Sequence, residues 1–108
     1  MGHADAFDAV LAGLPADWSL FEVHVALDDP RRLAEARVAL ARANARPVRG
    51  AGDHDFEITV ANTHGHGARA GVVRSALRIL DDLGIGGRTW AGGARTSLRP
   101  APAHRYGP

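Results

Sequence analysis

Apolar and polar side chains alternate along two segments of this chain, residues 19–27 (SLFEVHVAL) and 55–61 (DFEITVA). A period of two residues is typical of a strand that buries one face against a core. Both segments are rich in β-branched and aromatic residues, which favour a pleated sheet. We therefore predict two strands, with these residues on their inner faces: Phe21, Val23, Val25, Leu27, Phe56, Ile58 and Val60.

Apolar residues at helical spacing predict a short N-terminal helix over residues 4–13 and a longer one over residues 30–45. The longer helix has clear start signals, because Asp29 can cap the free amides and Pro30 fits the first helical position. We expect Pro47 to end it. The predicted inner stripe of this helix consists of Leu33, Ala36, Leu40 and Ala43.

The second half of the chain predicts one more helix, over residues 68–83, which Gly84 ends in a left-handed conformation. A short strand at 47–50 forms a hairpin with 55–61, and a last strand covers 89–94. The apolar stripe of the helix consists of Val73, Ala76, Leu77, Leu80 and Leu83, and the outward residues are Arg74, Arg78, Asp81 and Asp82.

The resulting order is an extra N-terminal helix followed by β-α-β-β-α-β. This order resembles the ferredoxin-like α+β fold over residues 19–94, which implies a four-stranded antiparallel sheet with two helices on one face. We expect a single domain over residues 1–96 and a Pro-rich tail, extended or disordered, over residues 97–108. A fold this widely used does not by itself imply a function.

In this fold the first and third strands are central neighbours. Pairing their apolar faces places His24 opposite Glu57 and Glu22 opposite Thr59, on the sheet face that the helices leave uncovered. A slip of two residues would instead pair His24 with Asp55 or Thr59. The predicted apolar pairs are Phe21 with Val60, Val23 with Ile58, and Val25 with Phe56.

A histidine and two carboxylates on one face offer acid–base chemistry, because a carboxylate orients an imidazole and stabilises its charged form. The candidate catalytic residues are therefore His24, Glu22 and Glu57. Thr59 is a candidate ligand-binding residue on the same face. The same polar residues also fit a dimer interface, which we favour, or an ordinary solvated sheet face. Two carboxylates and one histidine at loose spacing are a weak metal signal, so we expect neither a metal nor a cofactor.

A second candidate site is the glycine-containing segment before the third helix, with His64, His66 and Arg69 as ligand-binding candidates. Free amides at a helix N-terminus favour an anion. The glycine spacing matches neither common phosphate loop, and an H-x-H pair is only half of a metal site. We therefore favour an exposed loop here.

The remaining aromatic and histidine residues give weaker signals. Trp90 on the last strand is a ligand-binding candidate, with packing at the edge of the core as the alternative. His54 is expected to cap the turn before the second strong strand. No role is assigned to His3 or His104, which lie near the ends of the chain.

Composition excludes several classes of protein. The absence of cysteine among the 108 residues rules out disulfides and thiol nucleophiles. The net charge of +1 and 6% aromatic content argue against a nucleic-acid partner. No apolar run predicts a membrane span, and we expect a cytoplasmic protein. All 13 basic residues are arginine, which together with abundant alanine indicates a GC-rich, bacterial genome.

Two functional hypotheses follow. The first is a homodimeric module that binds a partner or small ligand through its uncovered sheet face. The second is a small cofactor-independent enzyme that uses His24, oriented by Glu22 or Glu57, for proton transfer or cyclisation. We favour the first, because the sequence offers no second convincing catalytic cluster.

Overall fold

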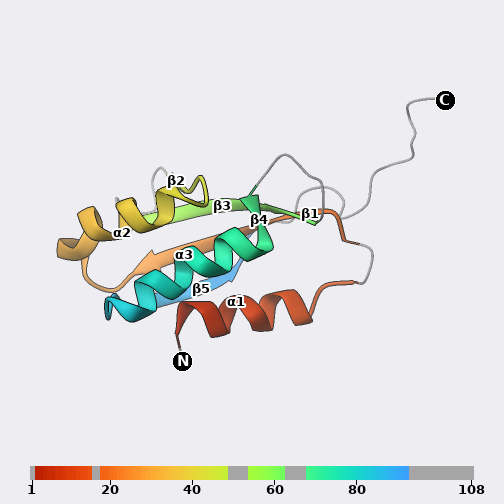
Figure 1. The fold of residues 1–108 in the computed structure, drawn as a ribbon, viewed down its shortest axis with the longest axis horizontal. Coiled ribbons are helices and arrows are strands. Elements are labelled where there is room, and N and C mark those ends of the chain that lie inside the picture. The colour runs from red at the N-terminus through yellow and green to blue at the C-terminus, as the bar shows by residue number, and fades with distance from the viewer. Residues whose placement is uncertain (1, 16–17, 49–53, 63–67, 93–108) are drawn as a thin grey trace.

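The computed structural model describes residues 2–15, 18–48, 54–62 and 68–92 and shows an α+β protein (Figure 1). Its sheet contains an antiparallel path in the order β2-β3-β1-β5. An additional strand, β4, pairs in parallel with β3. The strands are β1 (Leu20–Leu27), β2 (Arg46–Pro47), β3 (Asp55–Ala61), β4 (Ala68–Arg69) and β5 (Gly87–Ala91).

Helices cover one face of this sheet (Figure 1). They are α1 (His3–Ala12), the 3-10 turn η1 (Pro30–Arg32), α2 (Leu33–Ala41) and α3 (Ala70–Asp82). In the described part of the chain, no helix has the length and apolar character needed to cross a bilayer. The largest fully buried side chains between the two layers are Phe7, Phe21, Leu40, Ile58, Leu77, Leu80, Val23, Val25, Val60 and Val73.

The predicted pairing of the two central strands is confirmed. β1 and β3 are antiparallel neighbours, with His24 opposite Glu57 and Glu22 opposite Thr59. Burial alternates along β1, so its odd-numbered apolar residues face the helices and its even-numbered residues face away. The apolar pattern determines which face of each strand is buried, since a one-residue slip would turn Phe21, Val23 and Val25 away from the core. The structure then selects this register over the two-residue slip, which would keep the same faces buried.

The second helix begins as predicted but ends earlier. The Asp29 carboxylate accepts a hydrogen bond from the Arg31 amide at 3.0 Å, and hydrogen bonds from Arg31 lower the pKa of Asp29, which keeps the cap ionised. The helix then ends at Ala41 rather than near Pro47. Asn44 adopts a positive φ of 57°, a conformation that asparagine tolerates and that ends a helix before any proline is reached.

The strands in the second half differ from their predicted bounds. β2 is shorter than the predicted 47–50 strand and begins one residue earlier, while β5 lies about two residues before the predicted 89–94. The parallel strand β4 was not predicted, since two residues give no periodicity. The tail at 97–108 lies outside the described residues.

The end of α3 confirms the predicted cap and corrects one core residue. Gly84 has a φ of 71°, and the Ile85 amide donates to the Leu80 carbonyl at 3.0 Å. This is the hydrogen bond of a Schellman motif, which brings the second residue after the cap onto the helix. Ile85 is therefore buried, whereas Leu83, predicted to be buried, is 44% exposed.

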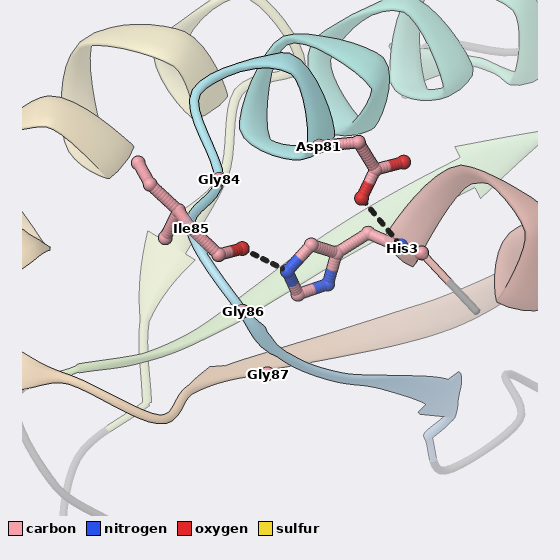
Figure 2. Close-up of a pocket in the computed structure, with 7 residues that line it drawn as sticks. His3, Asp81, Gly84, Ile85, Gly86 and Gly87 are labelled. Atoms are coloured by element: carbon pink, nitrogen blue, oxygen red, sulfur yellow. Dashed lines mark hydrogen bonds between the residues drawn. The ribbon is translucent and has the colours of Figure 1, made fainter.

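His3, for which the sequence indicated no role, is 3% exposed and fully hydrogen-bonded (Figure 2). Its Nε2 donates to the Ile85 carbonyl at 2.8 Å, and its Nδ1 lies 2.8 Å from the Thr89 hydroxyl. A carbonyl only accepts, so Nε2 carries the proton of this bond, while the Thr89 hydroxyl can serve Nδ1 as donor or acceptor. This histidine connects the start of α1 to β5 and to the loop after α3.

Asp81, predicted to face outward, caps α1 from a different helix (Figure 2). Its two carboxylate oxygens accept the amides of His3 at 2.7 Å and Ala4 at 3.0 Å. The residue before the helix, Gly2, has no side chain that could cap it. A Cβ atom at Gly2 would lie 2.6 Å from the Asp81 Oδ1, so glycine allows the carboxylate to approach. The pocket beside these residues is therefore lined by groups that already bond to one another.

Substitution of Asp81→Ala is expected to lower the free energy of unfolding by about 1–2 kcal/mol, the usual cost of a lost helix cap. The measurement is urea denaturation followed by far-UV circular dichroism. Asp82→Ala is the matched control, because Asp82 is the exposed next residue of α3 and should change stability by less than about 0.5 kcal/mol. Equal effects of the two substitutions would contradict the capping role.

Candidate functional site

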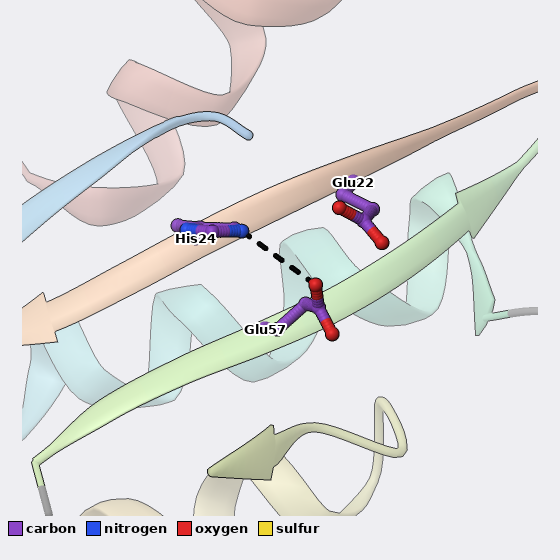
Figure 3. Close-up of side chains that lie close together, drawn as sticks. All are labelled: Glu22, His24 and Glu57. Atoms are coloured by element: carbon purple, nitrogen blue, oxygen red, sulfur yellow. Dashed lines mark ion pairs between the residues drawn. The ribbon is translucent and has the colours of Figure 1, made fainter. Parts of the chain in front are cut away.

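The candidate site lies on the sheet face opposite the helices (Figure 3). Glu22 and His24 come from β1 and Glu57 comes from the neighbouring β3. Each of the three residues stands between buried residues of its strand. Because side chains alternate between the two faces of a strand, all three point to the face opposite the core. In Figure 3 the helices lie behind the sheet and the three side chains stand in front of it.

The imidazole of His24 points toward the Glu57 carboxylate (Figure 3). The distance from His24 Nε2 to Glu57 Oε2 is 3.7 Å, which is an ion-pair distance but too long for a hydrogen bond. Both side chains are 25% exposed. Nε2 itself is inaccessible to solvent and has no hydrogen-bond partner among the described residues. The site therefore holds a buried nitrogen to which the described residues give no hydrogen bond.

Glu57 is held from its other side. Arg46 on β2 lies opposite Glu57 in the sheet and donates from Nη2 to Oε1 at 3.1 Å. One carboxylate oxygen is thus bound to the guanidinium, while the other is directed at His24. One oxygen each from Glu22 and Glu57, together with one ring nitrogen of His24, lie within 4.8 Å of one another.

β5 and the residue after it enclose the other side of the imidazole. The Trp90 ring meets His24 edge-on, with centroids 5.6 Å apart and planes at 62°. The Arg88 guanidinium carbon lies 4.5 Å from the Trp90 ring centroid, a cation–π arrangement. Gly92 donates its amide to the Glu22 carbonyl at 2.8 Å, and a Cβ atom there would lie 2.4 Å from His24 Nε2. Glycine at this position therefore allows the backbone to pack directly against the His24 imidazole.

This arrangement has two chemical capacities. The imidazole beside two carboxylates can accept or donate a proton, provided that Glu57 closes the remaining distance to His24 (Figure 3). The same nitrogen and carboxylate oxygens can instead bind a cation, since all three are donor atoms of metal sites.

The sequence-predicted residues divide into three groups. Thr59 lies half-buried opposite Glu22, on the predicted face. Trp90 also lies on this face, beside His24, rather than between the sheet and the helices. Arg69 is in β4. His64 and His66 lie outside the described residues.

Three contributors were not identified from the sequence: Arg46, Arg88 and Gly92. Arg46 lies opposite Glu57 because β2 begins at Arg46, whereas the predicted strand at 47–50 began one residue later and left Arg46 out. Arg88 lies before the predicted last strand, and Gly92 was counted within it. His54, expected to cap a turn, lies at the turn directly before β3, with Nε2 3.8 Å from the Asp55 Oδ1.

Comparison of the chain with protein-family models, with curated proteins and with solved structures found no match.

Substitution of Gly92→Ala is expected to displace the His24 ring, because the new methyl group would overlap it. Long-range ¹H–¹⁵N spectra of the histidine side chains should show changed His24 signals and unchanged His3 signals. Gly71→Ala is the control, since a Cβ atom at this helical position meets nothing within 4 Å. A His24 spectrum that remains unchanged in Gly92→Ala would contradict the close packing at Gly92.

Proposed function

We propose that this chain is a ferredoxin-like module that acts in the cytoplasm as a homodimer and binds a small ligand or partner through its uncovered sheet face. The ligand contacts would centre on His24, with Glu22, Glu57, Thr59 and Trp90 around it. The unsatisfied, buried Nε2 of His24 is the observation that carries this proposal.

The sheet topology supports the ferredoxin-like assignment. In the path β2-β3-β1-β5 the first and third strands of the chain are central neighbours, as that fold requires. The two connections that contain α2 and α3 lie on one face (Figure 1). The short parallel strand β4 and the helix α1 are additions to the simple scheme.

The state of His24 supports a binding role. Buried polar atoms in folded proteins are nearly always hydrogen-bonded, and each unsatisfied one costs about 1–3 kcal/mol. A water molecule, an ion or a bound ligand can complete the bonding of such an atom. The nitrogen lies on the sheet face that the described helices do not cover, beside an aromatic side chain, where a ligand gains both polar and apolar contacts.

The apolar residues of the same face support a second copy as the partner. Leu20, Ala26 and Trp90 are only half-buried there. A second copy packed face to face would complete their burial and would enclose the polar centre around His24, as small sheets do when a dimer closes a pocket.

Substitution of Thr59→Arg is expected to raise the dimer dissociation constant at least about tenfold, about 1.4 kcal/mol, because a long charged side chain at the centre of the interface would hold the two copies apart and would have to be desolvated. Sedimentation equilibrium of the full chain measures this. Ala34→Arg, which adds the same group on the exposed side of α2, is the control and should leave association unchanged. A wild-type chain that is monomeric at millimolar concentration would refute the dimer.

A second candidate function is a cofactor-independent enzyme, and the His24–Glu57 pair favours it. A distance of 3.7 Å closes to a hydrogen bond with a small side-chain movement, and a carboxylate beside an imidazole then supports proton transfer. Here Glu57 would orient His24 and His24 would touch the substrate.

Substitution of His24→Ala separates the two functions. Under the enzyme hypothesis it abolishes turnover and leaves dimerisation intact; under the binding hypothesis it mainly changes association or ligand affinity. Exchange of α-protons for deuterium in a panel of small keto acids and lactones, followed by ¹H NMR, tests for proton transfer. Exchange catalysed equally by wild type and His24→Ala would exclude His24 as the base.

A further inference from the structure

We propose that Glu22, His24 and Glu57 form a binding site for a divalent transition-metal ion, with His24 Nε2 as the nitrogen ligand. This inference rests on the proposed function, since it names the chemical class of ligand that the uncovered face takes. The spacing of these residues along the sequence gave only a weak metal signal. The pairing of β1 with β3 changes that, because it brings Glu57 to the other two.

The donor atoms are close to a coordinating arrangement. Around a tetrahedral ion with bonds of about 2.1 Å, ligand atoms lie about 3.4 Å apart. His24 Nε2 and Glu57 Oε2 are 3.7 Å apart, and all three donors lie within 4.8 Å of one another. These separations exceed the ideal spacing by about 1.4 Å at most, a difference of the size that side-chain rotation covers.

The nitrogen is buried in a manner that suits a metal ligand. If Nε2 carries a proton, that proton has no acceptor among the described residues; if it does not, its lone pair points toward a carboxylate. In either arrangement Nε2 lacks a hydrogen bond from the described residues, which costs free energy until another molecule or ion binds there. A divalent ion placed between His24 and Glu57 satisfies the lone pair and the carboxylate together. Trp90 and Gly92 restrict the ring from the sides, which fixes its direction.

Arg46 has the position of an outer-shell partner. It binds Glu57 Oε1 at 3.1 Å and leaves Oε2 directed at His24. Carboxylates that bind metals are commonly held by a hydrogen bond of this kind, and loss of such a partner typically weakens metal binding 10–100-fold, to order of magnitude.

The donor set favours zinc or a neighbouring first-row ion. One imidazole and two carboxylates suit zinc, cobalt, iron or manganese better than calcium, which takes oxygen ligands only. Three protein ligands leave a fourth position for water or a small anion, so the site would be an open one.

The test is a titration of the metal-free full-length protein with Zn²⁺ by isothermal calorimetry, with Co²⁺ absorption spectra as the second measurement. We expect one ion per chain and visible Co²⁺ bands typical of tetrahedral coordination. His24→Ala, Glu22→Gln and Glu57→Gln should each weaken Zn²⁺ binding at least about tenfold, and Arg46→Ala should weaken it about tenfold. The two glutamine substitutions keep side-chain shape, so they decide the result if His24→Ala does not fold.

The matched control is the double variant His64→Ala, His66→Ala, which removes the H-x-H pair of the sequence. Its Zn²⁺ affinity should equal that of wild type. Affinity lost in the double variant and retained in His24→Ala would overturn the proposal, as would the absence of any binding by wild type at millimolar Zn²⁺.

The outcomes also separate this site from the proposed function as a whole. If the chain forms a dimer that Thr59→Arg disrupts but binds no Zn²⁺, the metal site is refuted and the binding module stands. If Zn²⁺ binds through His24 while the chain stays monomeric at millimolar concentration, the metal site stands and the dimer is refuted.

Discussion

The pairing of β1 with β3 is the contact on which the rest of the structure depends. It buries the apolar residues of both strands under the helices and, by the same alternation, turns Glu22, His24 and Glu57 to the opposite face. Fold and site are therefore two consequences of one register. A substitution that weakened the apolar pairing would disturb the polar cluster without touching it.

The N-terminal helix contributes to the site from the other side of the sheet. His3 binds the hydroxyl of Thr89, which faces the core from β5, while the next residue, Trp90, faces away and contacts His24. Asp81 holds the first turn of the same helix against α3. These bonds hold α1 against β5, which itself pairs with β1. A residue close to the chain terminus thereby helps to determine the surroundings of an imidazole on the far face.

The polar cluster combines features that are uncommon together on an open sheet face. His24 Nε2 is enclosed and receives no hydrogen bond from the described residues. Arg46 binds one oxygen of Glu57, whose other oxygen is directed at His24. The Arg88 guanidinium lies over the Trp90 ring. An ordinary solvated face would leave such groups exposed to water and separately hydrated. The contacts among these groups, together with the enclosed Nε2, are the physical basis for the proposals of ligand binding and of a metal ion at this place.

The sequence by itself determined the long elements and the sheet face on which His24 and Glu57 lie, because alternation fixes which side chains of each strand are buried. It favoured the β1–β3 register that is found, but a slip of two residues would keep the same alternation, so the structure decided between these registers. Only the tertiary structure decided the contacts that depend on distant segments with no pattern of their own. These include the cap that Asp81 gives to α1, the burial of His3, the clamp of Arg46 on Glu57 and the approach of Gly92 to His24. Periodicity reports which face of an element is buried, but it carries no information on which distant side chain completes a hydrogen bond.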